Sequence, residues 1–590
     1  MPPHIRRQAE TVPPMTSGSK PIKLVFTQPT FVFIAVSGRR PKWRGTKVYV
    51  SLALILIFGI FVSSALAARQ ERLIDSWKPI NYDITLAFND QLSEIASARV
   101  AITVLAVKDV SVIDLDFGDL AVDSVTVDGV AMPFSRAPGL LIVKLTKPLP
   151  RDARAIVVVS YHGMPKDGLI LSKDKAGKPS AIGDNWPDRV HQWIPCFDHP
   201  SAKATVNFTV TAPARDLVVA NGKLAQVENS APASRTWTYT EAAPIPPYCM
   251  IVAAGEFAQV TMADAPITPL SYYVPQPDKP YAAHGFASAN PSLKFFSDTV
   301  ATYPYEKLAL IVGATRFGGM ENSSAIVFPN RFLEENLPEP LSSVFKVRQG
   351  LVEVVAHEIA HQWFGDSVTE STWADLWLSE GFATYFAGLM VQRYEGETRF
   401  KDYMQQAANT YFNFEKKTRI PIHDIETEDL FKLLNANNYQ KGAWVLHMLR
   451  AELGDENFFR GIRIYYEAHR GSVATTEDLR TAFEKAAGKS LKEFFAQWIY
   501  GPGHPRYELT WSWNSKSKRL RLVLDQTQSE AAFSNAVPIE IANDNGKRRI
   551  FIKPDSKHAV EDIKLDVAPT SLVVDPEDVL LDESRVIRKG

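Results

Sequence analysis

Two histidines four residues apart, with a glutamate directly after the first, are the residues in this sequence best suited to chemistry. They lie in AHEIAHQWFGD, residues 356–366. Because an α-helix turns about 100° per residue, His357 and His361 would share one face of a helix and could bind one ion. Glu358 would lie off that line, within reach of a water on the ion. Zinc hydrolysis needs three protein ligands, an open fourth position and a base. This segment supplies two ligands and the base.

A third ligand has to be found independently, because HExxH arises by chance in roughly one or two per cent of chains of this composition. The segment WADLWLSEGFATYF, residues 373–386, offers Glu380, with eighteen residues between it and His361. This spacing allows a helix, a turn and a return helix, with Ser379 as the N-cap of the second helix. Glu380 could instead be only a helix-dipole carboxylate. Beside HExxH, the ligand interpretation is favoured.

The composition is that of a large folded protein with an uneven charge distribution. The 590 residues are enough for several domains, and 45% hydrophobic and 11% aromatic residues allow substantial cores. Residues 1–47 carry nine Lys or Arg and one acidic residue, a net charge of +8, whereas the remainder has a net charge of −9. An acidic body argues against nucleic acid as a partner. It is compatible with amine-bearing substrates.

Residues 48–68, VYVSLALILIFGIFVSSALAA, are uncharged and follow a basic segment. Such a run predicts a signal peptide or a membrane anchor, with the body of the protein exported to the periplasm or the cell exterior. The ALA at 65–67 favours cleavage after Ala67 slightly over a retained anchor, although the run is just long enough to span a bilayer. A buried core helix is the less favoured alternative. The 47 preceding residues are unusual for a signal peptide, and a later start such as Met15 would explain them.

Hydrophobic patterning divides the rest of the chain into three regions. Residues 69–262 are rich in alternating and β-branched runs and predict a β domain. Within it, Asp128-Gly129 predicts a hairpin turn. Residues 263–505 change to helical periodicity, and both zinc-site segments fall there. Residues 506–590 return to strands.

The two cysteines do not form a metal site of their own. Cys196 and Cys249 have no CxxC partner, so no thiolate zinc site is available. After export they could form one disulfide, and two free buried thiols are equally consistent with the sequence.

Four motifs, taken together and in this order, resemble the M1 family of zinc aminopeptidases, in the gluzincin group. They are PCFDHP at 195–200, GGMEN at 318–322, HExxH with its distant glutamate, and YQKG at 439–442. The resemblance covers roughly residues 75–505. It implies a multidomain α+β fold with an N-terminal β saddle, a thermolysin-like, mostly helical catalytic domain and a small C-terminal β-sandwich. Many members add a large helical domain after the sandwich, and this chain ends too soon for one.

The resemblance also implies the roles of individual residues. His357, His361 and Glu380 would bind one zinc ion per chain, with Glu358 as the general base. Tyr439 matches the family's tyrosine that donates a hydrogen bond to the oxyanion. Glu321 of GGMEN matches the carboxylate that holds the free α-amine of a peptide. The other substrate-binding residues implied in this way are Gly318, Gly319, Met320 and Asn322.

One element of the family's pattern is missing. Members usually carry a Glu or Gln shortly upstream of PCxDxP that completes the amine pocket, whereas GDNWPDRVHQWIPCFD has no clear match. Asp184, Asn185 and Gln192 are the candidates. Asp375 and Lys441 lie inside family motifs, and both are expected to be surface charges with supporting roles.

The sequence therefore predicts an exported or membrane-anchored zinc aminopeptidase that removes N-terminal residues from peptides. A thermolysin-type zinc endopeptidase would use the same ligands without an amine anchor, so Glu321 discriminates between the two. Epoxide hydrolysis, found in one M1 branch, and a non-catalytic peptide-binding role are further alternatives. Retention of every ligand and of the base argues against the last of these. Zinc is expected from the ligand set, although a His₂Glu site also accepts cobalt or manganese.

Overall fold

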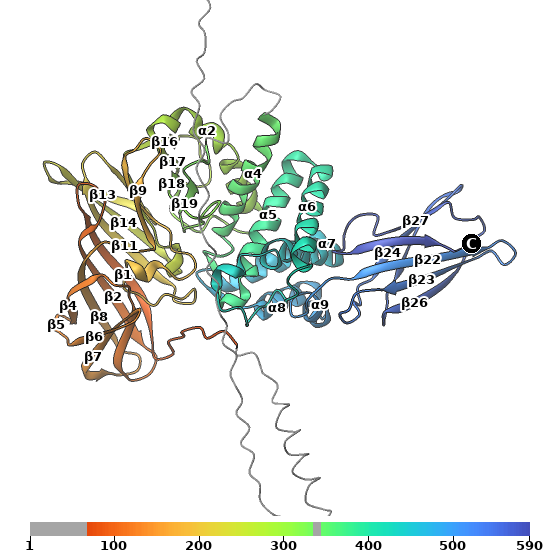
Figure 1. Ribbon diagram of the computed structural model, residues 1–590, viewed down its shortest axis with the longest axis horizontal. Helices are drawn as coiled ribbons and strands as arrows, with labels where there is room; N and C mark the ends of the chain where they lie inside the picture. The colour runs from red at the N-terminus through yellow and green to blue at the C-terminus, as the bar shows by residue number, and fades with distance from the viewer. Residues whose placement is uncertain (1–67, 334–343, 590) are drawn as a thin grey trace, which may run out of the picture. The chain divides into compact units, whose positions relative to one another are not determined.

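The computed structural model describes residues 68–333 and 344–589, which form a strand-rich, a helix-rich and a second strand-rich region along the chain (Figure 1). The basic tail, residues 1–47, and all but the last residue of the apolar run 48–68 lie outside the described residues. The signal peptide or anchor therefore stays a prediction. Within the described ranges, no helix is both long and apolar enough to cross a membrane.

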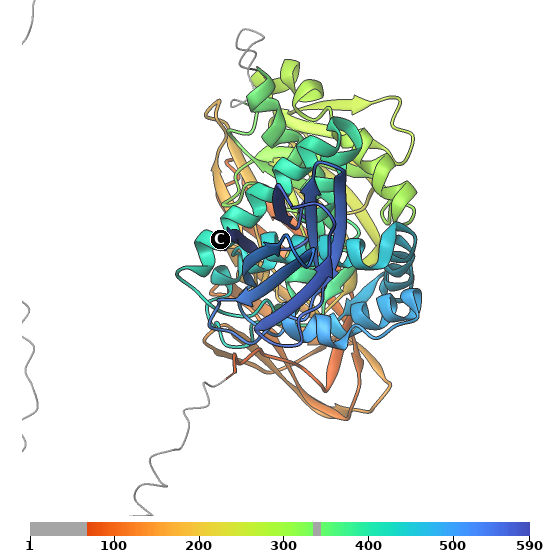
Figure 2. The same cartoon turned by 90° about the vertical axis from the view of Figure 1, so that its right-hand side faces the viewer.

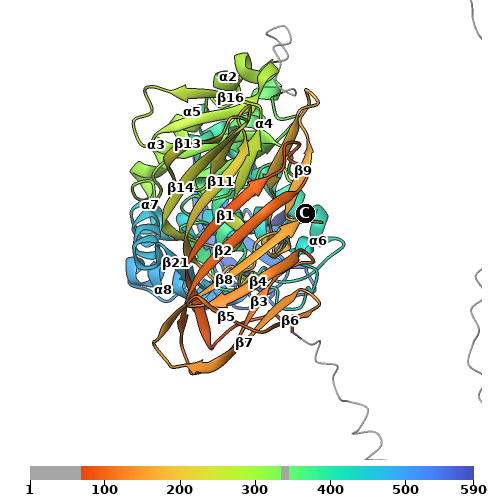
Figure 3. The same ribbon diagram turned by 90° about the vertical axis from the view of Figure 1, so that its left-hand side faces the viewer.

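The first region is built almost entirely from strands. Its largest sheet has eight strands in the order β13-β14-β11-β1-β2-β8-β4-β5, most of which lie side by side in Figure 3. Two smaller sheets, β3-β7-β6 and β12-β15-β10-β9, complete the region. The strands are β1 (Trp77–Phe88), β2 (Ile95–Ala106), β3 (Val110–Asp116), β4 (Ala121–Val127), β5 (Val130–Ala131), β6 (Phe134–Ala137), β7 (Leu140–Leu149), β8 (Arg154–Gly163), β9 (Leu169–Lys173), β10 (Pro179–Gly183), β11 (Ala204–Pro213), β12 (Leu217–Ala220), β13 (Lys223–Ala231), β14 (Ser234–Ile245) and β15 (Val252–Gly255).

Period-two alternation explains how this region buries its core. In β1, Tyr82, Ile84 and Leu86 are fully buried, whereas the residues between them are exposed. The predicted hairpin at Asp128-Gly129 is confirmed, since these residues have φ of 49° and 80° and join the antiparallel strands β4 and β5. In the same described part of the chain, both cysteines are separate buried thiols and not a disulfide.

The second region combines a four-stranded sheet with the helices. The sheet has the order β16-β17-β18-β19, and β16 pairs with β17 although it precedes residue 263, where helical periodicity was predicted to begin. The strands are β16 (Phe257–Met262), β17 (Leu270–Pro275), β18 (Leu308–Gly313), β19 (Ala325–Pro329), β20 (Val368–Glu370) and β21 (Ser472–Ala474). The helices are α2 (Ala282–Gly285), α3 (Ala289–Thr299), α4 (Val344–His361), α5 (Trp377–Glu395), α6 (Glu397–Glu415), α7 (Gly442–His469), α8 (Thr476–Ala487) and α9 (Lys492–Trp498).

Two of these helices form the centre of the region. Val355 and Ile359 of α4 are fully buried in the hydrophobic core, one turn apart, so that face of the helix packs inward. Every residue of α5 from Trp377 to Val391 is buried. A helix that is buried all round has a fixed position, and this property suits it to hold a ligand residue in place.

The third region consists of two sheets that share one core. Their orders are β26-β23-β22-β28 and β25-β24-β27, seen in blue in Figure 2. The strands are β22 (Arg506–Asn514), β23 (Arg519–Gln526), β24 (Val537–Asn543), β25 (Gly546–Ile552), β26 (His558–Lys564), β27 (Ser571–Val574) and β28 (Glu583–Arg588). Leu522 of β23 and Ile539 of β24 belong to the same hydrophobic cluster, as expected for a sandwich. The order of β, helical and β regions confirms the predicted multidomain α+β fold class.

Candidate active site

Three donor atoms from two helices meet at one point. His357 and His361 lie on α4, one turn apart, and Glu380 lies in the first turn of α5. The Nε2 atoms of the two histidines are 3.0 Å apart, and each is 3.3 Å from Oε2 of Glu380. Donor atoms placed about 2.0–2.2 Å from a tetrahedral zinc ion are about 3.3–3.6 Å from one another. Both distances to Glu380 match this spacing and the distance between the histidines is 0.3 Å shorter, so the three residues fit a zinc ion by ligand type and closely by spacing.

Groups behind His361 fix the orientation of its imidazole. Nδ1 lies 3.1 Å from the carbonyl oxygen of Phe364 and 3.0 Å from Oγ of Ser379. With an Nδ1–H donating to one of these oxygens, Nε2 keeps its lone pair for a metal. The predicted N-cap role of Ser379 is wrong, because α5 begins two residues earlier, at Trp377, and Ser379 lies within the helix. Its hydroxyl contacts His361 instead.

Glu358 and Glu380 are both buried, yet their surroundings shift their pKa values in opposite directions. Burial raises the pKa of Glu358 well above its usual value, and the neighbouring carboxylate of Glu321 adds to the rise. Burial acts in the same direction on Glu380, but His361 and His357 outweigh it and lower the pKa of Glu380 to about 2. Two carboxyl groups separated in this way can divide acid–base work. Glu380 stays ionised, as a ligand must, and Glu358 is suited to accept a proton.

The segment Gly318–Asn322 runs close to α4. Met320 and Val327 exchange two backbone hydrogen bonds, with N to O distances of 2.8 and 2.9 Å, which fix the segment against β19. A Cβ atom at Gly319 would lie 2.2 Å from Oε1 of Glu358, so any larger residue here would require the Glu358 side chain to shift. A Cβ atom at Gly318 would meet no other atom of the described residues within 4 Å.

Glu321 places a carboxylate directly beside the proposed ligands and base. Side-chain donor atoms of Glu321, Glu358 and His361 all lie within 4.8 Å of one another. Burial raises the pKa of Glu321 to about 7, and only 7% of the residue is exposed. Nε2 of Gln362 donates to the backbone carbonyl of Glu321 at 2.8 Å and thereby ties this segment to α4. A positively charged amine next to the metal site would find its counter-charge here.

These residues line one cleft of about 340 Å³, which is near the lower end of the usual range for ligand sites. Tyr439 also lines it, from a π-helical turn at Asn437–Lys441, and its ring stacks on His357 with centroids 5.9 Å apart. Burial and the nearby Glu380 raise the pKa of Tyr439, so the phenol keeps its proton and can donate it in a hydrogen bond. The described lining is Trp186, Phe317, Gly318, Gly319, Met320, Glu321, Glu353, Val354, His357, Glu358, His361, Glu380, Thr384, Tyr403, Leu434, Tyr439 and Gln440.

Asn322 is the one predicted substrate-binding residue outside this described lining. It is fully buried, and its Nδ2 donates to the carbonyl of Met320 at 3.4 Å. Asn322 therefore supports the conformation of the segment Gly318–Asn322 and does not face the cleft.

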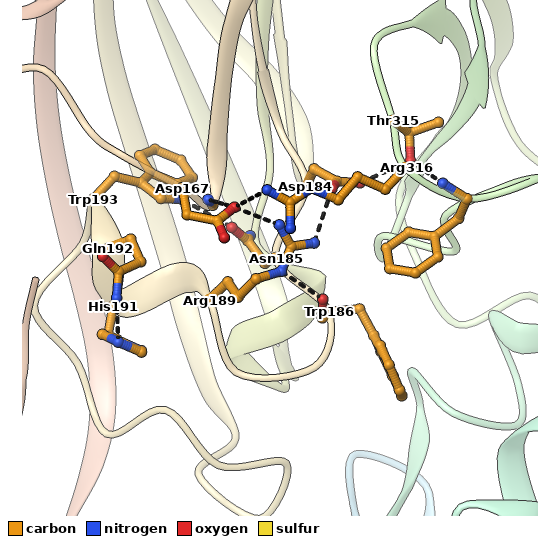
Figure 4. Close-up of polar contacts among 12 residues, drawn as sticks. Asp167, Asp184, Asn185, Trp186, Arg189, His191, Gln192, Trp193, Thr315 and Arg316 are labelled. Atoms are coloured by element: carbon orange, nitrogen blue, oxygen red, sulfur yellow. Dashed lines mark hydrogen bonds and ion pairs between the residues drawn. The ribbon is translucent and has the colours of Figure 1, made fainter. Parts of the chain in front are cut away.

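The loop upstream of PCFDHP does not offer the cleft a second carboxylate. Asp184 is fully buried, and its two oxygens accept hydrogen bonds from Thr315 at 2.7 Å and from Arg189 at 2.8 Å (Figure 4). Asp167 joins the same network, accepting from Arg189 at 2.6 Å and from Arg316 at 2.7 Å. The charge of Asp184 is thus compensated by protein groups.

Asn185 and Gln192, the two other candidates in this loop, also have protein groups as their hydrogen-bond partners. The amide of Asn185 donates to a backbone carbonyl and accepts from an indole N–H, and the amide of Gln192 lies 2.6 Å from the ring of His191. Asp184, Asn185 and Gln192 are all missing from the described cleft lining, which includes Trp186. Trp186 is neither an acid nor an amide, so the family's pattern of a Glu or Gln in this loop does not predict it. Its position next to Asn185 in the same loop was the available signal.

Asp375 and Lys441 are not surface charges, and that expectation is wrong. Asp375 is 3% exposed, and its Oδ1 accepts from the backbone N–H and the hydroxyl of Thr476 at the start of α8. Lys441 is fully buried, with Nζ 3.3 Å from the carbonyl oxygen of Gly501 and 5.5 Å from the ring centre of Tyr411. Both charged groups therefore join segments that are distant in the sequence.

Lys441 should make stability depend on pH. Burial lowers its pKa in the folded protein from 10.5 to about 7. Between these values the unfolded chain binds more protons than the folded one, so this residue's contribution to the free energy of unfolding rises with pH. Relative to Lys441→Met, the wild-type free energy of unfolding should rise by up to about 1.4 kcal/mol per pH unit across that window. Urea unfolding of the wild type and of Lys441→Met at pH 7 to 10 measures this difference in free energy. The exposed Lys417→Met is the control, and parallel curves for wild type and Lys441→Met would contradict the prediction.

Comparison with known proteins gives matches over both the first and second regions. A model of the peptidase M1 N-terminal domain matches residues 78–249, and a model of the peptidase family M1 domain matches residues 285–498. The chain is 27% identical over 390 residues to glutamyl aminopeptidase of Homo sapiens, covering 64% of this chain and 40% of that protein. It is 27% identical over 472 residues to probable aminopeptidase 2 of Sulfurisphaera tokodaii, covering 78% and 58%.

A third relative has a similar identity to this chain. Leucyl aminopeptidase of Saccharolobus solfataricus is 29% identical over 352 residues, which cover 58% of this chain and 43% of that protein. The chain thus spans about half the length of the curated relatives it matches. The matched ranges include every residue of the candidate site.

Proposed function

The chain belongs to peptidase family M1, and on that basis we propose that it is a zinc-dependent aminopeptidase that removes N-terminal residues from peptides. The observation that carries the proposal is the convergence of His357, His361 and Glu380 in one cleft with two further buried carboxylates, Glu358 and Glu321. The first three fit a zinc ion. The other two supply a base and a counter-charge for an amine.

Each side chain has one task in the proposed hydrolysis. Zinc, when bound, would polarise the scissile carbonyl and lower the pKa of a water toward 7. Glu358 takes a proton from the attacking water and later delivers it to the nitrogen of the leaving amine. A carboxylate oxygen of Glu358 lies within 4.8 Å of a ring nitrogen of His361, so the base lies beside the proposed metal position.

The remaining groups orient the peptide. The hydroxyl of Tyr439 donates a hydrogen bond to the carbonyl oxygen as negative charge develops on it. Glu321 accepts hydrogen bonds from the protonated α-amine of the substrate. Gly319 and Met320 place backbone groups along the bound peptide, close to Glu358. Because the described lining contains no second acid from the loop at Asp184, the amine depends mainly on Glu321.

The alternative functions are less well supported. A thermolysin-type endopeptidase would not need a buried carboxylate at Glu321, and the relatives described above are named as aminopeptidases. A non-catalytic peptide-binding protein would not need Glu358. Cobalt or manganese could replace zinc in a His₂Glu site.

The decisive experiment compares free and N-acetylated peptides. The zinc-loaded chain should release residues one at a time from the N-terminus of a free peptide and leave the acetylated peptide intact, as followed by mass spectrometry. In Glu321→Ala, kcat/KM for the free peptide should fall about 10- to 100-fold, because a charge-assisted hydrogen bond contributes about 1.5–3 kcal/mol.

The matched control is Glu467→Ala, which removes an exposed carboxylate on α7. It should cleave the free peptide at the wild-type rate. Internal cuts in both peptides would point to the endopeptidase, and equal rates in Glu321→Ala and wild type would remove the amine anchor from the proposal.

Export remains part of the proposal and has only sequence support. The apolar run at residues 48–68 and the basic residues before it favour a periplasmic or extracellular enzyme, cleaved after Ala67 or held by an anchor. The N-terminal sequence of the protein purified from its own cells distinguishes these two outcomes.

A further inference from the structure

The residues that line the cleft fall into an apolar and a polar group. Trp186, Phe317, Met320 and Leu434 belong to, or pack against, a single hydrophobic cluster, and we call the part of the lining that they form the apolar end. The polar lining residues Glu353, Thr384 and Tyr403 come from the helices α4, α5 and α6. Glu321 follows Met320 in the chain, so the group proposed to hold the α-amine adjoins the apolar end.

Trp186 is held in a fixed position. Its backbone carbonyl accepts from Nε of Arg189 at 2.8 Å, in the network of Figure 4, and its indole points away from that network. The indole makes edge-to-face contacts with Phe317, Trp373 and Phe431, at centroid distances of 5.9, 5.6 and 5.8 Å. Such contacts leave the ring little freedom to rotate out of the cleft.

Charged groups near this end are already compensated. Arg189 is bound to Asp184 and Asp167, and Arg316 is bound to Asp167 at 2.7 Å. A charged substrate side chain placed against Trp186 would lose water without gaining a described partner, and this is unfavourable. An apolar side chain placed there would gain from burial against the aromatic rings.

We propose that Trp186 is the specificity-determining residue of the site, and that the enzyme prefers peptides whose first residue has a large, uncharged side chain, aromatic or long aliphatic. This inference rests on the proposed function. The first side chain lies against Trp186, Phe317 and Met320 while Glu321 holds the amine. Trp186 is a binding residue and takes no part in bond cleavage.

The test uses four tripeptides that differ only in their first residue: leucine, phenylalanine, glutamate or arginine. The zinc-loaded full chain should cleave the leucine and phenylalanine peptides with a kcat/KM at least about tenfold above the glutamate and arginine peptides. Trp186→Ala should lower the ratio of kcat/KM for the two apolar peptides to kcat/KM for the two charged peptides about tenfold. Trp186→Glu should raise the ratio of arginine to leucine peptide cleavage at least about tenfold, because it introduces a counter-charge.

Trp513→Ala is the matched control, since this tryptophan lies on β22 in the third region and packs against a separate hydrophobic cluster. It should leave the ratios between peptides unchanged. Because ratios are compared, a partial loss of folded protein does not affect the result, and Trp186→Ala decides alone if Trp186→Glu does not fold.

Three outcomes would overturn the inference. Wild-type preference for glutamate or arginine, or ratios in the Trp186 variants equal to wild type, would refute it while leaving the aminopeptidase proposal intact. Cleavage of none of the four peptides would refute the proposed function and this inference with it.

Discussion

Glu358→Gln should abolish nearly all peptide cleavage while leaving the protein at least as stable as the wild type. Glutamine has the same shape but cannot take a proton from water, so kcat should fall by at least about 10²–10⁴, the usual contribution of a general base. The stability expectation comes from burial. The pKa of Glu358 is raised in the fold, which means that the folded protein favours the neutral form. A neutral amide at this position removes the repulsion from Glu321 and Glu380.

Proton binding determines the direction of this effect on stability. A carboxyl group with a raised pKa binds its proton more tightly in the folded chain, so its contribution to stability falls as pH rises above the unfolded value. In the metal-free protein, Glu358→Gln should therefore show a melting temperature equal to or above that of the wild type near neutral pH, and after loading it should bind as much zinc as the wild type. Loss of activity together with loss of zinc would mean that Glu358 supports the metal. A kcat within tenfold of wild type would exclude it as the base.

The residues of the candidate metal site could be predicted from the sequence because their geometry is local. A single helix is enough to bring His357 and His361, at positions i and i+4, to one face. A second helix packed against it is enough to bring Glu380 to the same point. The N-cap predicted at Ser379 was wrong because the preceding turn decides where α5 begins. A 3₁₀ turn at Trp373–Asp375 leads directly into α5, so the helix begins before the residue that resembles a cap.

The walls of the cleft could not be predicted in this way, because they come from residues far apart in the sequence. Trp186 reaches the cleft from the first region, and contacts with Phe317, Trp373 and Phe431, all distant in sequence, hold its indole there. Burial of Lys441 depends likewise on contacts with Gly501 and Tyr411, which no local pattern reveals. A short motif specifies which residue types meet a ligand, whereas the tertiary packing specifies what surrounds them.

Glu380→Ala should remove the bound metal and, with it, all activity. Two histidines remain, and a zinc site with two protein ligands is incomplete. The loss of zinc affinity should exceed the roughly 10- to 100-fold that is typical of an outer-shell residue. Zinc stabilises a protein that binds it in the folded state by about 2.7 kcal/mol at a concentration 100 times the Kd. The wild type should therefore melt at a higher temperature with zinc than with a chelator, and Glu380→Ala should melt at the same temperature in both.

Ser379→Ala provides a graded comparison, because Ser379 contacts Nδ1 of His361 and not the metal position. Its zinc affinity should fall by about 10- to 100-fold or less, with activity restored by excess zinc. Metal content measured on the purified proteins separates the two cases. If Glu380→Ala kept one zinc per chain, the third ligand would have to be another carboxylate, and Glu321, within 4.8 Å of His361, would be the residue to replace next. Its double role as ligand and amine anchor would then be untenable, since a metal-bound carboxylate has little charge left for an amine.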